Sequence, residues 1–183
     1  MEKKYIKLKY AVERQSFEDS LTLFLDSKHI EWWKRGENEY VGFYESVIAY
    51  IATYSEFDED LATLYPYYSG FLYTLEEIKK IREFGNYLWD WAHALHPKAE
   101  QYEKKYRNYD YVYLTDKRFK TMQENAKKLL DYLKINDAKY DYERSLNTSP
   151  EDESWYDYEC ETITKQDYER FFNVTLHPNH GGC

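Results

Sequence analysis

Two histidines three residues apart, His93 and His96, stand in the stretch HALHP, and Glu100 follows four residues later. On a helix this spacing brings the side chains to one face, and imidazole and carboxylate groups are ligands that zinc accepts. The common helical zinc motif differs, because its histidines are four apart with a glutamate between them. A metal-dependent enzyme that uses His93 and His96 is therefore one alternative. The other is that both lie in the last turn of a helix and interact favourably with its C-terminal partial charge.

The end of the chain offers a second possible group of ligands, His177, His180 and Cys183, in an irregular tail beside two glycines. The sequence contains no Gly-x-Ser-x-Gly turn and no glycine-rich phosphate loop. Carboxylates are abundant, but their spacing does not show which of them would share a cleft. We therefore expect a protein that is not an enzyme and that uses no metal or cofactor.

A different chemistry is concentrated between Asp137 and Thr162, where the local net charge is −7 and the only basic residues are Lys139 and Arg144. The stretch SWYDYECET mixes aromatic rings with carboxylates. Tyrosine and tryptophan are favoured as interface anchors, and carboxylates complement a basic partner and speed its encounter. This region therefore predicts a surface that binds a cationic protein. The predicted partner-binding residues are Tyr140, Asp141, Tyr142, Glu151, Asp152, Glu153, Trp155, Tyr156, Asp157, Tyr158, Glu159 and Glu161.

The same residues have a second interpretation. Trp155, Tyr156 and Tyr158 could pack a C-terminal helix onto the core while the acids point to water. The triplet Tyr-Asp-Tyr occurs three times, but its irregular spacing argues against a structural repeat. Whether these triplets face a partner or pack on the core stays open at this point.

The formal net charge of −9 argues against direct binding of nucleic acid, which requires lysine and arginine to neutralise phosphates. Lysine pairs such as Lys79-Lys80 are typical of solvated helix faces. No apolar run approaches the roughly 20 residues needed to span a bilayer, and the first residues lack the apolar stretch of a signal peptide. We expect a cytoplasmic protein with no membrane segment, in which Cys160 and Cys183 are free thiols.

The chain has only 6 Gly and 4 Pro, and its apolar residues recur mostly at helical spacing. Leucine, isoleucine, valine and phenylalanine are scarce, so the 22 Tyr and 5 Trp must supply much of the buried area. The predicted fold is mainly α, a single-domain helical bundle with short irregular or strand-like connections. It comprises residues 1–183, with a core at about 16–135 and an acidic aromatic C-terminal region at about 136–183.

The clearest predicted helix begins with the capping box at Thr74 and presents one apolar face up to Pro97. A second helix follows Asp116, and we expect these two to pack together as the core. The stretch NYDYVYLTD between them could be a short strand or a connection. The other expected helices run from Ser16 to near Ser27, from about Tyr40 to Ser55, from Ser149 over a short distance, and from Thr164 through Phe172.

In general character the sequence resembles the small acidic immunity proteins of bacterial polymorphic toxin and contact-dependent growth inhibition systems. The features that carry this resemblance are the cytoplasmic start, the compact length, the charge of −9 and segments such as EDESWYDYECE and KYDYE. Immunity proteins of this kind bind one cognate toxin, often a basic nuclease, and cover or mimic what its active site would bind. The resemblance implies that this chain inhibits a cognate basic protein toxin through its acidic aromatic region.

An alternative of the same chemistry is a phage or plasmid anti-defence inhibitor that imitates nucleic acid. Such a mimic should spread its carboxylates in a long band with phosphate-like spacing. An immunity protein needs only one compact patch. Because the acid excess is confined to a short part of the chain, the sequence favours the compact patch.

Overall fold

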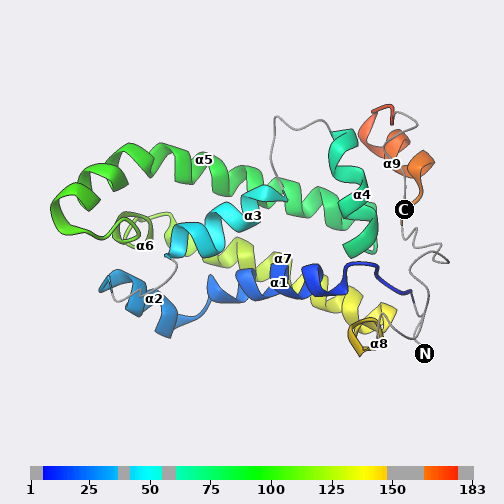
Figure 1. Ribbon diagram of the computed structural model, residues 1–183, viewed down its shortest axis with the longest axis horizontal. Helices are drawn as coiled ribbons and strands as arrows, with labels where there is room; N and C mark the ends of the chain where they lie inside the picture. Colours follow the sequence, from blue (N-terminus) through cyan, green and yellow to red (C-terminus); the bar gives the residue numbers. More distant parts are fainter. Residues whose placement is uncertain (1–5, 37–41, 55–60, 148–162, 177–183) are drawn as a thin grey trace. The chain divides into compact units, whose positions relative to one another are not determined.

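The computed structural model describes residues 6–36, 42–54, 61–147 and 163–176 (Figure 1). Every regular element within these ranges is a helix, so the predicted mainly α fold is confirmed. The chain divides into two compact units. Unit 1 comprises Met1–Ser16, Phe57–Lys80 and Tyr132–Cys183, and unit 2 comprises Phe17–Glu56 and Ile81–Asp131. Unit 1 combines segments from both ends of the chain.

The described part of unit 1 contains three complete helices and the ends of three longer ones. The complete helices are α4 (Leu61–Phe71), α8 (Tyr142–Asn147) and α9 (Lys165–Phe172). The longer helices, which continue into unit 2, are α1 (Ala11–Leu23), α5 (Leu75–Tyr106) and α7 (Phe119–Tyr140). Unit 2 adds α2 (Ser27–Lys34), the π-helix η1 (Tyr44–Ala49), α3 (Tyr50–Thr53) and α6 (Tyr111–Leu114).

The cores of both units rely on aromatic rings, as the scarcity of aliphatic residues predicts. In unit 1 the rings of Tyr73 and Tyr140 stack with centroids 4.7 Å apart inside a buried cluster that also holds Leu8 and Ala11. In unit 2 the fully buried ring of Phe24 meets Phe43 edge-on and stacks on Phe119. Trp91 on α5 stacks on Phe119 of α7, so the two helices pack together in unit 2 as expected.

Helix α5 begins as the sequence predicts and ends later. The Thr74 hydroxyl accepts the backbone N–H of Glu77, as the capping box requires. The helix then continues through Pro97 to Tyr106, although proline has no N–H to donate to the preceding turn. Packing on the far side of Pro97 offsets that loss, since Ala99 is fully buried and Tyr102 stacks on Tyr111. The predicted end at Pro97 is therefore wrong.

Other boundaries differ because contacts distant in sequence override local signals. Helix α1 begins at Ala11, before the expected start at Ser16. Helix α2, which the sequence did not predict, is capped by the Asp26 carboxylate, and that carboxylate accepts the backbone N–H groups of the first turn. The segment that could have been a strand forms the short helix α6. The predicted start of α9 is confirmed, since the Thr164 hydroxyl accepts the backbone N–H of Asp167.

None of the helices in the described part of the chain combines the length and the apolar character needed to cross a bilayer. The predicted helix at Ser149 and the tail from His177 lie outside the described residues.

Gly70 on α4 gives the first testable prediction, because unit 1 leaves no room for a side chain there. The backbone N–H of Tyr10 donates to the Gly70 carbonyl oxygen at 2.9 Å, and a Cβ at Gly70 would lie 2.2 Å from the Tyr10 ring. We expect Gly70→Ala to lower the free energy of unfolding by about 1–3 kcal/mol, measured by urea denaturation.

A double-mutant cycle with Tyr10→Ala isolates the clash. In that background the same Gly70 substitution should be neutral or stabilising, since alanine favours a helix over glycine by about 1 kcal/mol. An equal loss of stability with and without the Tyr10 ring would contradict this explanation.

Candidate functional site

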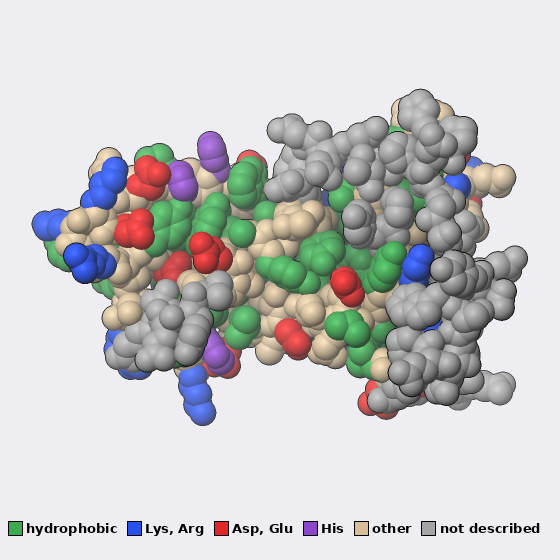
Figure 2. All heavy atoms as spheres, viewed as in Figure 1, with side chains coloured by type: hydrophobic (Ala, Val, Ile, Leu, Met, Phe, Trp, Pro, Cys, Tyr) green, Lys and Arg blue, Asp and Glu red, His purple; other side chains and the backbone are tan. Residues whose placement is uncertain are grey.

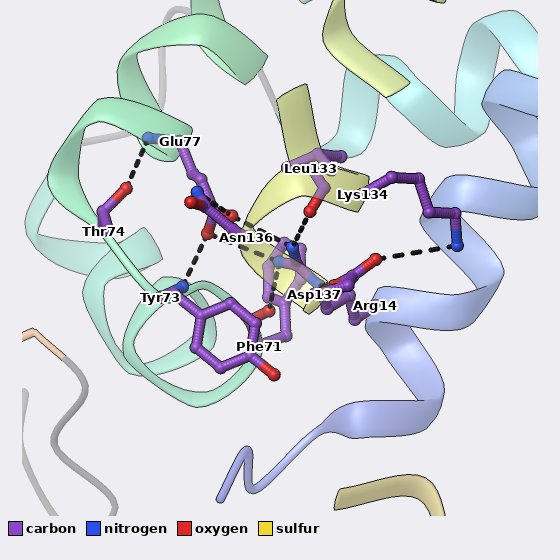
Figure 3. Close-up of polar contacts among 9 residues, drawn as sticks. All are labelled: Arg14, Phe71, Tyr73, Thr74, Glu77, Leu133, Lys134, Asn136 and Asp137. Carbon is purple, nitrogen blue, oxygen red and sulfur yellow. Dashed lines mark hydrogen bonds and ion pairs between the residues drawn. The ribbon is translucent and has the colours of Figure 1, made fainter. Parts of the chain in front are cut away.

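A buried arginine organises the part of unit 1 from which the acidic aromatic region begins. Figure 3 shows Arg14 of α1, which is 1 % exposed, among partners from α4, α5 and α7. Its Nε donates to Asp137 at 2.7 Å, and its two terminal nitrogens donate to both oxygens of Glu77 at 3.0 and 3.3 Å. The same nitrogens also donate to the backbone oxygens of Phe71 and Leu133, each at 3.2 Å. The planar guanidinium has five N–H groups, and these contacts can use all of them.

The acids of this network are also bonded on their other sides. Glu77, which is fully buried, accepts the backbone N–H of Tyr73 at 2.6 Å and the Asn136 side-chain amide at 2.9 Å. Asp137 lies 3.6 Å from the Lys134 ammonium. Buried charges are tolerated only when they are paired and hydrogen-bonded. The sequence gives no sign of this network, because its members lie up to 123 residues apart.

The network fixes the last turn of α7, where the first of two predicted partner-binding tyrosines lies. Tyr140 and Tyr142 are 8 % and 5 % exposed, and both belong to the core of unit 1. The Tyr142 hydroxyl donates to the Ala11 carbonyl oxygen at 2.7 Å, and its ring lies against the Arg14 guanidinium. The rings of Tyr140 and Tyr142 therefore pack on the core, which is the second interpretation that the sequence left open. Asp141 between them is half-buried.

The other predicted partner-binding residues, Glu151 to Glu161, lie outside the described residues. The described chain resumes at Ile163, directly after this acidic stretch, and Ile163 is bound to α4. The Tyr65 hydroxyl donates to the Ile163 carbonyl oxygen at 3.0 Å. In the opposite direction, the Tyr168 hydroxyl of α9 donates to the Leu61 carbonyl oxygen of α4 at 2.6 Å. We call this reciprocal pair of bonds, with its packed rings of Tyr65 and Tyr168, the α4–α9 clamp (Figure 1).

Two acidic segments that are far apart in the sequence each directly precede a residue of the α4–α9 clamp. Residues 55–60, which precede Leu61, read SEFDED, and residues 148–162, which precede Ile163, read TSPEDESWYDYECET. Neither segment contains lysine or arginine. The sequence alone gave weight only to the second segment.

Unit 2 holds a second group of tyrosines and acids, which we call the acidic tyrosine cluster. Its rings are Tyr44 of η1, His96 of α5, and Tyr109 and Tyr113 around α6. Tyr44 meets Tyr109 edge-on at 5.4 Å and lies 5.5 Å from Tyr113. The Tyr113 hydroxyl donates to that of Tyr109 at 3.1 Å, and the Tyr109 hydroxyl is bonded to Nδ1 of His96. Its acids are Glu45, Glu100, Glu103 and Asp110.

Asp110 places η1 against the rings of the acidic tyrosine cluster. Its buried carboxylate accepts the backbone N–H of Phe43 at 2.8 Å and that of Tyr44 at 3.0 Å. Burial raises the pKa of the Asp110 carboxyl, these two N–H groups lower it, and the charges of Glu45 and Glu103 raise it further. Residues in π-helices frequently belong to functional sites, and η1 presents Tyr44 to this cluster.

The acids at the rim of the cluster are exposed. The side chain of Glu100 is 52 % exposed and lies 3.5 Å from Nε2 of His96. Glu45 and Glu103 are exposed as well. Within the described ranges, none of these three glutamates forms an ion pair with lysine or arginine. On the face drawn in Figure 2, acidic, hydrophobic and histidine side chains lie together over α3, α5 and α6 of unit 2.

The hydroxyls of the acidic tyrosine cluster are hydrogen-bonding groups rather than nucleophiles. Burial raises the pKa of Tyr44 and of Tyr113 above its ordinary value. Burial also raises the pKa of Tyr109, and the charges of Glu100 and Glu103 act in the same direction. The three phenols therefore stay protonated and uncharged near neutral pH. Tyr113 is fully buried, whereas Tyr44 and Tyr109 are half-buried and stay partly exposed to a ligand.

The two histidines of the possible metal site have other surroundings than expected. They do not lie in the last turn of their helix, because α5 continues to Tyr106. The predicted interaction of both histidines with the helix C-terminus is therefore wrong. His93 stacks on Trp89, and His96 contacts Tyr109 and Glu100. Among the described residues no group of three or more histidines, cysteines or acids could hold a metal ion.

Sequence reasoning missed the acidic tyrosine cluster, although two signals for it were present. Tyr109 and Tyr113 are four residues apart, which is the spacing of neighbours on one helical face. His96 and Glu100 have the same spacing. Treating the stretch from Tyr109 as helical would have grouped its rings. The contribution of Tyr44 has no local signal, because Asp110 holds it from 66 residues away.

No family model, no curated protein and no solved structure matched this chain in the comparisons that we made.

Replacing Arg14 tests the buried network. Arg14→Met removes the only cation bonded to Glu77 among the described residues and leaves that carboxylate buried. Breaking a buried pair in this way costs about 3–5 kcal/mol, so the variant should show a much lower urea midpoint. Lys79→Met, an exposed change in the same unit, should stay within about 0.5 kcal/mol of the wild type. Equal stabilities for the two variants would show that the network does not hold unit 1.

Asp110 gives a prediction for unit 2. Asp110→Asn keeps one acceptor oxygen but presents an amide NH2 to the second backbone N–H of η1. We expect a loss of about 1–2 kcal/mol in the free energy of unfolding. The tyrosine fluorescence or NMR signals of the ring cluster should change as well. Glu124→Gln, an exposed change on α7, is the control, and a variant Asp110→Asn with unchanged stability and spectra would refute the proposed anchoring of η1.

Proposed function

We propose that this protein binds and neutralises a cognate basic protein, most simply as an immunity protein that inhibits a bacterial toxin in the cytoplasm. The observation that carries the proposal is the pair of acidic segments that end at the α4–α9 clamp. Carboxylates without neighbouring basic residues attract a cationic partner and speed its encounter. Trp155, Tyr156 and Tyr158 supply the aromatic anchors that interfaces favour.

The contacts of the described residues before and after residues 148–162 support this proposal. On one side α7 is fixed by the Arg14 network, and Tyr142 is bonded to α1. On the other side α9 is fixed by the α4–α9 clamp. Both anchors belong to unit 1. A binding segment with two fixed ends loses less conformational entropy on binding than a free tail of equal length, and this favours affinity.

The alternative of an anti-defence inhibitor that mimics nucleic acid uses the same charges. The second acidic segment at residues 55–60 supports this alternative, because acids without basic neighbours in the sequence are then not confined to one short part of the chain. The two proposals differ in the partner. An immunity protein should bind the product of the reading frame immediately upstream, whereas a mimic should compete with nucleic acid for a host nuclease.

The kinetics of binding to the upstream gene product test the proposal. Replacing Glu151, Asp152 and Glu153 by their amides should slow association and flatten its salt dependence, since exposed charges act over about 8 Å at physiological ionic strength. Trp155→Ala should act mainly on the dissociation rate and weaken binding by about 2 kcal/mol or more.

The control replaces three acids elsewhere, Glu83, Glu124 and Asp131, by their amides. This variant has the same net charge and should associate faster than the first one. If Trp155→Ala lowers the melting temperature and leaves affinity unchanged, the aromatic residues only pack the fold. Unchanged kinetics in both the Trp155 and the acid variants would place the binding face elsewhere.

A further inference from the structure

The acidic tyrosine cluster of unit 2 is a second place where aromatic rings and acids meet, and the proposed function so far does not use it. It is built from described residues alone. Its rings come from three elements, and its exposed acids Glu45, Glu100 and Glu103 stand around them. The combination of carboxylates and aromatic rings indicates a cationic ligand.

Several other acids of unit 2 are paired with lysine or arginine. Asp131 is paired with Lys127 at 2.6 Å, Glu31 with Lys34 at 2.9 Å, and Asp116 with Arg118 at 3.0 Å. Within the described ranges, Glu45, Glu100 and Glu103 form no such ion pair. The charges of Glu100 and Glu103 raise the pKa of Tyr109, and those of Glu45 and Glu103 raise the pKa of Asp110. The three negative charges therefore act on the neighbouring residues Tyr109 and Asp110.

The rings add a preference for one kind of cation. Tyr44 and Tyr109 are half-buried, so each residue stays partly exposed to solvent. A guanidinium stacks on aromatic faces and fits a carboxylate with two parallel N–H groups, whereas an ammonium does neither as well. Glu100 and Glu103 lie three residues apart on α5, so their carboxylates share one face of the helix. Both can therefore approach the N–H groups of one guanidinium.

We propose that the acidic tyrosine cluster binds an arginine side chain of a basic protein partner, with Tyr44 and Tyr109 as the aromatic contacts and Glu100 and Glu103 as the carboxylates. The proposal rests on the proposed function, because it assigns one contact with the cationic partner. It adds a site in unit 2 to the segments anchored in unit 1. Asp110 is a positioning residue, since it holds η1 and therefore the Tyr44 ring.

The test uses three blocked pentapeptides on the full-length protein, each with four glycines around a central arginine, lysine or citrulline. Citrulline has the shape of arginine without the charge. Titration followed by NMR should show shifts for Tyr44, Tyr109 and the α5 amides near Glu100. We expect the arginine peptide to bind at least tenfold more tightly than the citrulline peptide and at least threefold more tightly than the lysine peptide.

Two charge variants with equal net charge decide whether the site is specific. Glu100→Gln with Glu103→Gln changes only exposed side chains and should weaken binding of the arginine peptide at least fivefold. The control, Glu83→Gln with Glu124→Gln, removes two exposed acids of the same unit and should change binding less than twofold. Equal losses in both variants would show that the peptide senses net charge alone and would overturn the site.

Other outcomes also refute the proposal. Equal binding of the arginine and citrulline peptides would remove the role of charge, and equal binding of the arginine and lysine peptides would remove the preference for guanidinium.

Binding of the upstream gene product distinguishes the arginine site from the proposed function. If it binds the protein with unchanged affinity in the Glu100→Gln, Glu103→Gln variant, the arginine site is wrong and the proposed function stands. If it does not bind at all while the arginine peptide does, the proposed function fails and the site remains.

Discussion

The buried guanidinium of Arg14 is the interaction on which unit 1 depends. Taking this charge out of water is costly, and the cost is offset only because its N–H groups reach Glu77, Asp137 and two backbone carbonyls. Those acceptors come from the end of α4, the start of α5 and the end of α7. A single residue of α1 therefore determines where three other helix ends lie. This leaves little freedom at the point where α7 leads into the acidic region.

The two units contribute related chemistry in different ways. Unit 1 supplies anchors: the Arg14 network and the α4–α9 clamp fix the chain on either side of segments that carry acids without bases. Unit 2 supplies a formed surface, in which the buried Asp110 holds Tyr44 against Tyr109 and exposed glutamates surround the rings. In both cases carboxylates accompany aromatic side chains. That combination is suited to a cationic protein and unsuited to the phosphates of nucleic acid.

The sequence predicted the helices whose signals are local. The cap at Thr74 and the start of α9 at Thr164 are set by side chains three residues from their partners, so pattern reasoning identifies them. It failed where distant contacts decide. Packing of Ala99 and Tyr102 carries α5 past Pro97, and Asp110 forms the N-terminal cap of a π-helix 66 residues away. The inward position of Tyr140 and Tyr142 depends on Arg14 and on the Ala11 carbonyl, neither of which any spacing near Tyr140 reveals.

The most direct test of the account is bacterial growth when the upstream reading frame is expressed alone and together with this protein. The account predicts that the upstream product alone stops growth and that the wild-type protein restores it. A variant in which Glu151, Asp152 and Glu153 are replaced by their amides and Trp155 by alanine should fold but restore growth poorly. Growth arrest that the wild-type protein does not relieve, or an upstream product without any effect on growth, would contradict the claim that this protein neutralises a toxin.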